Sequence, residues 1–186
     1  MNKKVLFTAL LAVATMFGVS AQKFKPAPSF LKGQSEINIV FDFSNVKYGK
    51  ETQAEQYKNK DKAWIDEWEG RRRENFVEIF TGSLNDELKK LNVAAGTFPN
   101  AEYTIIVEVV NCYFGFYAGI VNQPAYLEAT LKVVKTGTLD VLSQITLKEG
   151  QNPYTVAATP VDFDRLSLAV VEVGEEAGEK LVKALK

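Results

Sequence analysis

The sequence predicts an α+β fold: a two-layer sandwich in which two helices cover one face of a four-stranded mixed or antiparallel sheet. The expected chain order is strand-helix-strand-strand-strand-helix. Three observations lead to this fold class. Residues 103–147 contain three apolar runs separated by turn signals, which is typical of a β-meander. An alternating run lies at 36–44, and two stretches with helical periodicity occupy 61–91 and 162–186. We therefore expect one domain at 36–186.

The first predicted strand is the run from Glu36 to Ser44. Apolar and polar side chains alternate along it, so one face of the strand should lie in the core. The apolar set is Ile37, Ile39, Phe41 and Phe43. The next segment, 46–61, is polar and contains four lysines and several turn residues. We expect this segment to be an exposed loop.

The long helical stretch from Asp61 to Leu91 has one apolar stripe. The stripe is formed by Trp64, Ile65, Trp68, Phe76, Val77, Phe80, Leu84, Leu88 and Leu91. Gly82 interrupts it, so the stretch forms either one helix or two helices that meet at Thr81. Trp64 and Trp68 lie four residues apart on the stripe. We expect them in the core rather than on a ligand-binding surface.

The meander has its clearest half-buried strand in the second run, 127–133, where apolar and polar residues alternate strictly. In the third run, 139–147, one face is expected to hold Leu139, Val141, Ile145 and Leu147. The long helix separates strand 36–44 from the meander. A parallel pairing between them would need a right-handed crossover, and a helix of this length can provide it.

The last helix is predicted from an N-cap at Asp162 to the end of the chain. Its apolar stripe is formed by Leu166, Ala169, Val170, Val173, Ala177, Leu181 and Ala184. Gly174 and Gly178 have the spacing of a membrane dimerisation pair, but the neighbouring glutamates exclude a bilayer setting. We expect the two glycines to permit close packing against another helix.

The N-terminus has the three parts of a secretory signal: two lysines, an apolar run at 5–19 and small residues that end at Ala21. A retained membrane helix would need roughly 20 apolar residues and a stop signal. We therefore predict a signal peptide at 1–21 and an exported product, periplasmic or secreted, without a transmembrane segment. No cysteine lies near Ala21 to carry a lipid anchor. Prolines and a glycine predict an extended arm at 22–35.

Composition excludes several classes of function. The chain has 22 basic and 23 acidic residues, and this balance lacks the basic footprint of a nucleic-acid-binding protein. The single cysteine, Cys112, permits no internal disulfide, and we expect it to be buried at a strand end rather than reactive. The sequence contains no histidine, which removes the usual general base and the commonest zinc ligand. We predict no catalytic residues, no metal site and no cofactor.

The order of elements over 36–186, with the strand Ala101 to Val107 after the long helix, resembles the envelope module in the N-terminal domain of the translocation protein TolB and in several lipoprotein families. The signal ending Ser20-Ala21-Gln22 is similar to those of exported Bacteroidetes proteins. The resemblance implies a role in envelope assembly or binding, and it supplies no catalytic residues. The absence of a lipid cysteine departs from the lipoprotein pattern.

The most unusual surface candidate is an aromatic loop between the first two strands of the meander. The residues predicted to bind a partner are Tyr113, Phe114, Phe116, Tyr117 and Tyr126. In one interpretation alternate rings point inward and cap the core, because aromatic residues favour strands. In the other, the hairpin projects beyond the sheet and exposes its rings to a protein or glycan. Because a strand has a period of two, Tyr113 and Phe114 cannot share one face.

Two function hypotheses follow. The first is a non-catalytic exported module of the cell envelope, or a secreted one, that binds a protein or a glycan partner. The alternative is a carboxylate-based hydrolase such as a glycosidase, which needs only two acidic residues in a cleft. Asp162 and Asp164 are the nearest such pair, although at a helix start they suit capping and the helix dipole. Asp42 is expected to face solvent.

Overall fold

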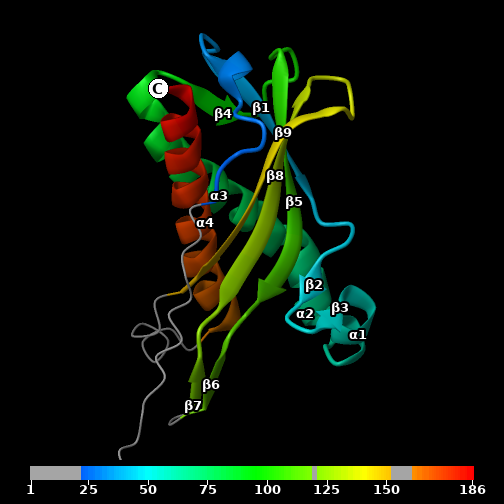
Figure 1. Cartoon of the computed structure of the whole chain (residues 1–186). Helices are drawn as coiled ribbons and strands as arrows, with labels where there is room; N and C mark the ends of the chain where they lie inside the picture. Colours follow the sequence, from blue (N-terminus) through cyan, green and yellow to red (C-terminus); the bar gives the residue numbers. More distant parts are fainter. Residues whose placement is uncertain (1–21, 119–120, 152–160) are drawn as a thin grey trace, which may run out of the picture.

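A computed structural model describes residues 22–118, 121–151 and 161–186 (Figure 1). The predicted signal peptide at 1–21 lies outside the described residues. Within those residues, no helix has the length and apolar character needed to span a membrane. The longer elements are β1 (Glu36–Asp42), α3 (Arg73–Leu88), β5 (Tyr103–Tyr113), β8 (Tyr126–Lys135), β9 (Val141–Gly150) and α4 (Asp162–Leu185).

The described part of the main sheet has seven strands, so the prediction of four was wrong. The additional strands are short: β2 (Lys47–Tyr48), β3 (Glu51–Thr52) and β4 (Ala94–Gly96). Strands β4, β1, β5, β8 and β9 lie side by side in this order. β2 pairs with β5 beyond the end of β1, on the same edge of β5, and β3 pairs with β2. Two or three residues are too few to give a period-two signal, so sequence patterns missed these strands.

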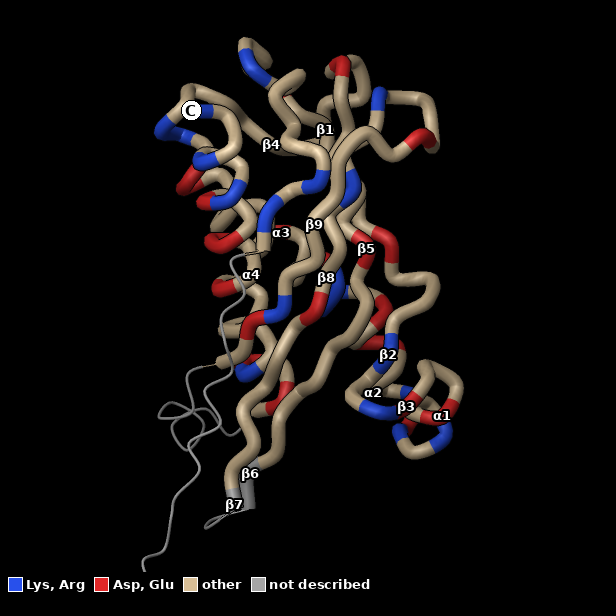
Figure 2. The backbone as a smooth tube through the Cα atoms, in the orientation of Figure 1, with Lys and Arg blue, Asp and Glu red and all other residues tan. Residues whose placement is uncertain are grey.

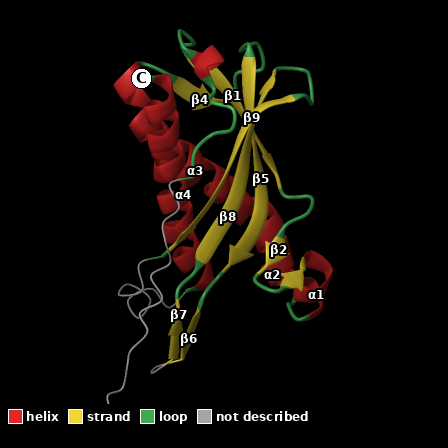
Figure 3. Cartoon of the chain, in the orientation of Figure 1, coloured by secondary structure: helices red, strands yellow, loops and turns green. Residues whose placement is uncertain are grey.

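The sheet is mixed, which is one of the two predicted alternatives. β1 pairs with β5 in parallel, with Asn38 opposite Thr104, and the helical region between the two strands makes the crossover. β5, β8 and β9 form the expected antiparallel meander. Both long helices cover the same face of the sheet (Figure 3). The third strand begins later than predicted, because Leu139 is 88% exposed in the turn before β9.

The long helical stretch is divided at a different place from the one expected. Helix α2 (Lys62–Glu67) leads through a π-helical turn, η2 (Trp68–Arg72), into α3. The break is at Gly70, whose backbone has φ −98° and ψ −113°. Thr81 and Gly82 lie inside the continuous α3 helix, so the alternative of two helices that meet at Thr81 is wrong. Gly70 provides the backbone freedom that the kink requires.

The segment predicted as an exposed loop, 46–61, is instead structured. It contains β2, β3 and α1 (Gln53–Lys58), and a capping box between Thr52 and Glu55 begins this helix. Val46 and Tyr48 are buried in the core. Lys47, Lys50 and Lys58 are exposed, so the composition of the segment resembled that of a loop.

The N-terminal arm packs along the outer edge of β9. Lys25 forms a β-bridge with Gln144, and the hydroxyl of Ser143 donates to the carbonyl oxygen of Pro26 at 2.6 Å. Phe24 is buried in the core, and so is Leu31 in the short 3-10 turn η1 (Ser29–Leu31). The arm therefore covers part of the sheet edge and closes one end of the core.

Helix α4 packs directly against α3 through its two glycines. A Cβ atom on Gly174 would lie 2.8 Å from the Cβ of Ser83 and 2.9 Å from the carbonyl oxygen of Phe80. A Cβ on Gly178 would lie 2.5 Å from the Cβ of Glu87. These separations are below van der Waals contact, so only glycine permits the helices to approach this closely. The predicted packing role of both glycines is confirmed.

We predict that Gly178→Ala lowers the free energy of unfolding by about 1 to 3 kcal/mol, because the added methyl group pushes the two helices apart. The matched control is Gly82→Ala on α3, where a Cβ would meet open space. Alanine there should raise the free energy of unfolding by about 0.5 to 1 kcal/mol through helix propensity. Urea unfolding compares the two variants. Equal stabilisation by both alanines would contradict the close packing.

Glu149 lies near the end of β9, on the face that α4 covers. Partial burial is the main cause that raises the pKa of its carboxyl group above the ordinary value of 4.5. The negative charges of Glu176 and Glu172 raise this pKa further, while Lys180 lowers it. Figure 2 shows acidic and basic residues together along α4. The folded protein therefore retains the Glu149 proton to a higher pH than the unfolded chain does.

This shift predicts how Glu149 affects stability. The contribution of protonated Glu149 to the free energy of unfolding is fully present below the pKa of this group in the unfolded chain. It is lost as the pH rises through the raised pKa of the folded protein. Glu149→Gln should therefore raise the free energy of unfolding at pH 7, and this gain should shrink toward pH 4. Urea unfolding at several pH values measures it, with the exposed Glu78→Gln as the control. A gain that does not change with pH would contradict the assigned cause.

Candidate functional site

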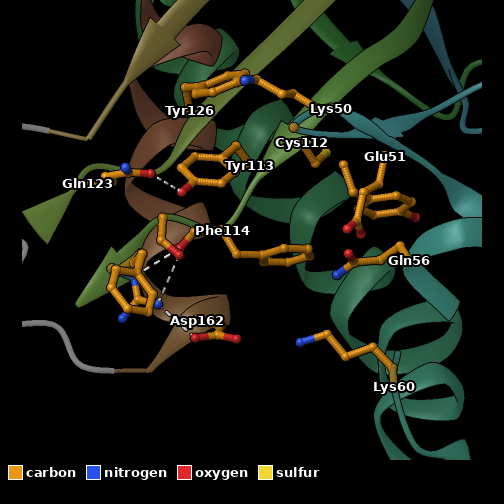
Figure 4. Close-up of a pocket in the computed structure, with 15 residues that line it drawn as sticks. Lys50, Glu51, Gln56, Lys60, Cys112, Tyr113, Phe114, Gln123, Tyr126 and Asp162 are labelled. Atoms are coloured by element: carbon orange, nitrogen blue, oxygen red, sulfur yellow. Dashed lines mark hydrogen bonds and ion pairs between the residues drawn. The ribbon is translucent and has the colours of Figure 1, made fainter. Parts of the chain in front are cut away.

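A cleft of about 770 Å³ opens at the end of the sheet where β5 leads into a separate hairpin, β6 (Phe116–Ala118) and β7 (Val121–Gln123). One wall comes from β5, β6, β7, β8 and the start of α4, and the other from the β2–β3 turn and α1 (Figure 4). The volume is within the range of ligand-binding clefts. We call it the hairpin cleft; it is lined by Tyr48, Gly49, Lys50, Glu51, Gln56, Lys60, Cys112, Tyr113, Phe114, Gly115, Phe116, Gln123, Tyr126, Asp162 and Arg165.

The predicted aromatic residues divide between the core and the surface. Phe114 is buried, with 7% of its surface exposed, while Phe116 is 50% exposed. Tyr113 and Tyr126 are half-buried. Tyr117 belongs to β6, but its side chain lies outside the described part of the chain. Hairpin β6–β7 extends beyond the main sheet and carries Phe116 with it (Figure 1).

Tyr113 and Tyr126 pack against each other and against neighbouring groups. Their ring centroids lie 5.3 Å apart, and a Cβ on Gly49 would lie 3.1 Å from Cδ2 of Tyr113. The ammonium group of Lys148 lies 4.4 Å from the centroid of Tyr126. The Tyr113 hydroxyl also donates a hydrogen bond to the side-chain oxygen of Gln123. The two tyrosines therefore line the cleft with part of each ring in contact with other groups.

The base of the hairpin is held by Arg165 on the first turn of α4. Its side chain is almost fully buried, and its Nε donates to the carbonyl oxygen of Phe114 at 2.9 Å. Its Nη2 donates to Asp162 Oδ1 at 2.7 Å. Gly115 has φ +73°, and a Cβ there would lie 2.7 Å from the carbonyl oxygen of Gln123. A glycine is therefore required where the chain leaves β5.

An aromatic cluster supports the cleft from below. The Phe114 ring packs edge-on against Trp64, Trp68 and Phe163, with centroid distances of 5.4 to 5.7 Å. Trp68 is 1% exposed, and its indole N–H donates to the Tyr48 hydroxyl at 2.6 Å. Burial raises the pKa of Tyr48, so this hydroxyl stays protonated. Trp68 is a core residue, as predicted, whereas Trp64 is only partly buried and packs against the core. The cluster gives the cleft a rigid base.

The second wall is polar and is positioned by Asn111 of β5. The amide N–H of Gly49 donates to Asn111 Oδ1 at 2.8 Å, and Asn111 Nδ2 donates to the Gly49 carbonyl oxygen at 2.9 Å. This pair of hydrogen bonds fixes the β2–β3 turn beside β5. Lys50 and Glu51 follow Gly49 directly in the chain, so their side chains lie at the cleft. The position of Gly49 also depends on its φ of +65°, which favours glycine.

Among the described residues, Glu51 and Asp162 are the two acidic side chains that line the cleft. Glu51 and Asp162 line the cleft from opposite walls, and Figure 4 shows them well separated. Asp162 forms an ion pair with Arg165. It is the first residue of α4, and Val161 holds the N-cap position, so the predicted N-cap was one residue too late. Asp164 lies 4.0 Å from Arg72. Asp42 accepts from the Ser44 amide at 2.8 Å, which lowers its pKa.

Within the described residues, Cys112 and the acidic side chains are the groups that could carry redox or metal chemistry. Cys112 is fully buried, and burial raises the pKa of its thiol, so the thiolate is disfavoured at neutral pH. Within residues 22–118, 121–151 and 161–186, no group of three or more acidic or cysteine side chains is arranged to hold a metal ion. The arrangement is suited to binding through apolar contact, hydrogen bonds and charge.

Sequence reasoning missed several residues of the cleft. Arg165 lies among the apolar residues of the predicted stripe, and an arginine at such a position was a signal of a buried partner. Asn111 interrupts an apolar strand where β5 shifts register against β8, which was a signal of a bulge. Lys50 and Lys60 had no comparable signal, because they lie in a segment that resembled a loop.

The positions of Phe114 and Phe116 give a prediction about stability. Phe114→Ala should lower the free energy of unfolding by about 3 to 5 kcal/mol, because it leaves a cavity in the aromatic cluster. Phe116→Ala should change it by no more than about 0.5 kcal/mol, because that ring is half exposed. Chemical denaturation of both variants tests this difference. A strong loss of stability in both would show that Phe116 is a core residue.

Comparisons with known proteins give limited information. No protein-family model matches the chain, and no curated protein matches it. Similar solved structures include two forms of the PelC dodecamer from Paraburkholderia phytofirmans, one of them a point variant. The variant is 12% identical and has a TM-score of 0.46, with 86% of this chain and 95% of that chain covered. The other is 9% identical with a TM-score of 0.46, and the coverage is 83% and 96%. Neither likeness is close enough to support an argument about function or assembly.

Proposed function

We propose that this protein is an exported, non-catalytic binding module of the cell envelope, or a secreted one, that binds a protein or glycan partner with hairpin β6–β7 and the hairpin cleft. Export is proposed from the three-part signal at 1–21. A role in the envelope also agrees with the resemblance in element order to the TolB-like modules. Both points rest on sequence patterns.

The observation that carries the binding proposal is the exposure of Phe116 on a projecting and anchored hairpin. Half of the Phe116 surface is accessible, although aromatic side chains are usually buried. Arg165 and Gly115 fix the hairpin at its base, so the ring is presented at a defined place beside the cleft. A preorganised aromatic group beside a concave surface is the usual form of an interface hot spot.

The alternative of a carboxylate-based hydrolase receives less support from the geometry. A retaining glycosidase holds its two carboxyl groups about 5 Å apart, and an inverting one holds them at roughly 6.5 to 9.5 Å with a water between them. Asp162 is instead paired with Arg165, while Glu51 lies on the other wall (Figure 4). Glycoside hydrolysis that is lost in Glu51→Gln would restore the hydrolase hypothesis.

The test uses the mature chain, residues 22–186, as bait for the native envelope extract and for a glycan array. We expect Phe116→Ala to weaken retention of the bound partner about tenfold or more, because removal of a hot-spot ring costs more than 1 kcal/mol. Leu139→Ala is the matched control, since Leu139 is also exposed but lies in the β8–β9 turn at the other end of the sheet (Figure 1). Equal retention by both variants would contradict the proposed site.

A further inference from the structure

The two walls of the hairpin cleft differ in whether their polar groups already have partners. On the hairpin wall, Tyr113 is bonded to Gln123, and Asp162 is paired with Arg165. On the opposite wall, four polar side chains make no hydrogen bond or ion pair with any other described residue, and they are Lys50, Glu51, Gln56 and Lys60. The polar groups of the largely aromatic wall are therefore already hydrogen-bonded or ion-paired, whereas those of the polar wall are not, although Lys60 contacts the Trp64 ring.

The charges of the polar wall are ordered along the cleft. Figure 4 shows Lys50 and Lys60 at opposite ends, with Glu51 and Gln56 between them. Lys60 is held in place by Trp64, since its ammonium group lies 4.8 Å from the ring centroid. Two separated cations with an acidic group between them attract a ligand whose negative charges are also separated. A continuously anionic polymer would meet Glu51 in the middle, and like charges at close range are unfavourable.

The aromatic wall is poorly suited to stacking a sugar ring. Carbohydrate stacking needs a free ring face, but Tyr113 and Tyr126 pack against each other and the ammonium group of Lys148 lies over the Tyr126 ring. Phe116 is half exposed, and parts of the two tyrosines remain accessible. Such a surface accommodates an aliphatic or aromatic side chain, which requires apolar contact but no particular stacking geometry.

From these two walls we propose that the hairpin cleft binds an extended peptide segment of a partner protein, with an apolar side chain against Phe116 and acidic side chains that reach Lys50 and Lys60. The backbone N–H groups of the same segment can donate to the Glu51 carboxylate or the Gln56 side-chain oxygen, and its carbonyl oxygens can accept from the Gln56 side-chain amide. This inference rests on the proposed function of the site and adds the chemical class of the partner.

The first experiment selects binders from a random peptide library displayed on phage, with the mature chain as the target. We expect the selected peptides to combine an aromatic or aliphatic residue with two separated Asp or Glu residues. A selected peptide is then synthesised, and its Kd is measured by fluorescence anisotropy. The Kd should rise with salt, because partly exposed ion pairs are screened.

The second experiment reverses the charges of the polar wall. The double variant Lys50→Glu with Lys60→Glu should weaken the acidic peptide about tenfold or more and should select basic peptides from the same library. The matched control reverses two exposed lysines that do not line the cleft, Lys32→Glu with Lys135→Glu, which gives the same change in net charge. This control should keep the original selection and the original affinity.

The outcomes separate this inference from the proposed function. If no peptide is selected, while an envelope or glycan ligand still depends on Phe116, the binding module stands and the peptide inference is wrong. If the acidic peptide binds equally well to both double variants, the polar wall does not recognise it, and the inference is also overturned. If neither a peptide nor any other ligand depends on Phe116, the proposed function itself fails.

Discussion

The close contact between α4 and α3 fixes the geometry on which the rest of the structure depends. Gly174 and Gly178 let the two helix backbones approach until side chains of α3 occupy the space that a Cβ would fill. This approach sets the position of α4 over β8 and β9, and hence the position of its first turn. Arg165 on that turn then meets the carbonyl oxygen of Phe114, where β5 leaves the sheet. A helix contact in the core thus determines where a surface hairpin projects.

The aromatic cluster connects the kinked helical region to the same place. Gly70 permits the break before α3, and Trp64 and Trp68 on one side of it pack against Phe114 and Phe163. The cluster brings together β5, the α2–α3 region and α4, so it resists relative motion of the elements that form the cleft. Rigid support of this kind is expected under a binding site, because it reduces the entropy lost when a ligand binds.

The cleft combines this rigidity with polar groups that remain available. Asn111 fixes the β2–β3 turn through two hydrogen bonds, and the turn presents Lys50 and Glu51 beside the anchored hairpin. The buried groups at the base are paired, whereas the side chains on the polar wall make no hydrogen bond or ion pair with other described residues. Unpaired charges at the edge of a concave surface cost little while they are solvated, and they contribute to specificity when a complementary partner arrives.

The sequence by itself determined the α+β class, the meander and the amphipathic helices, because each depends on a periodicity within one segment. It also determined that Tyr113 and Phe114 must point to opposite faces. The tertiary structure decided which of these rings lies in the core, since burial depends on α2 and α4, which are distant in the chain. It also decided the short strands and the hairpin cleft. Lys50, Asn111 and Arg165 are separated by 50 residues or more, and only the packing of β2, β5 and α4 brings them to one site.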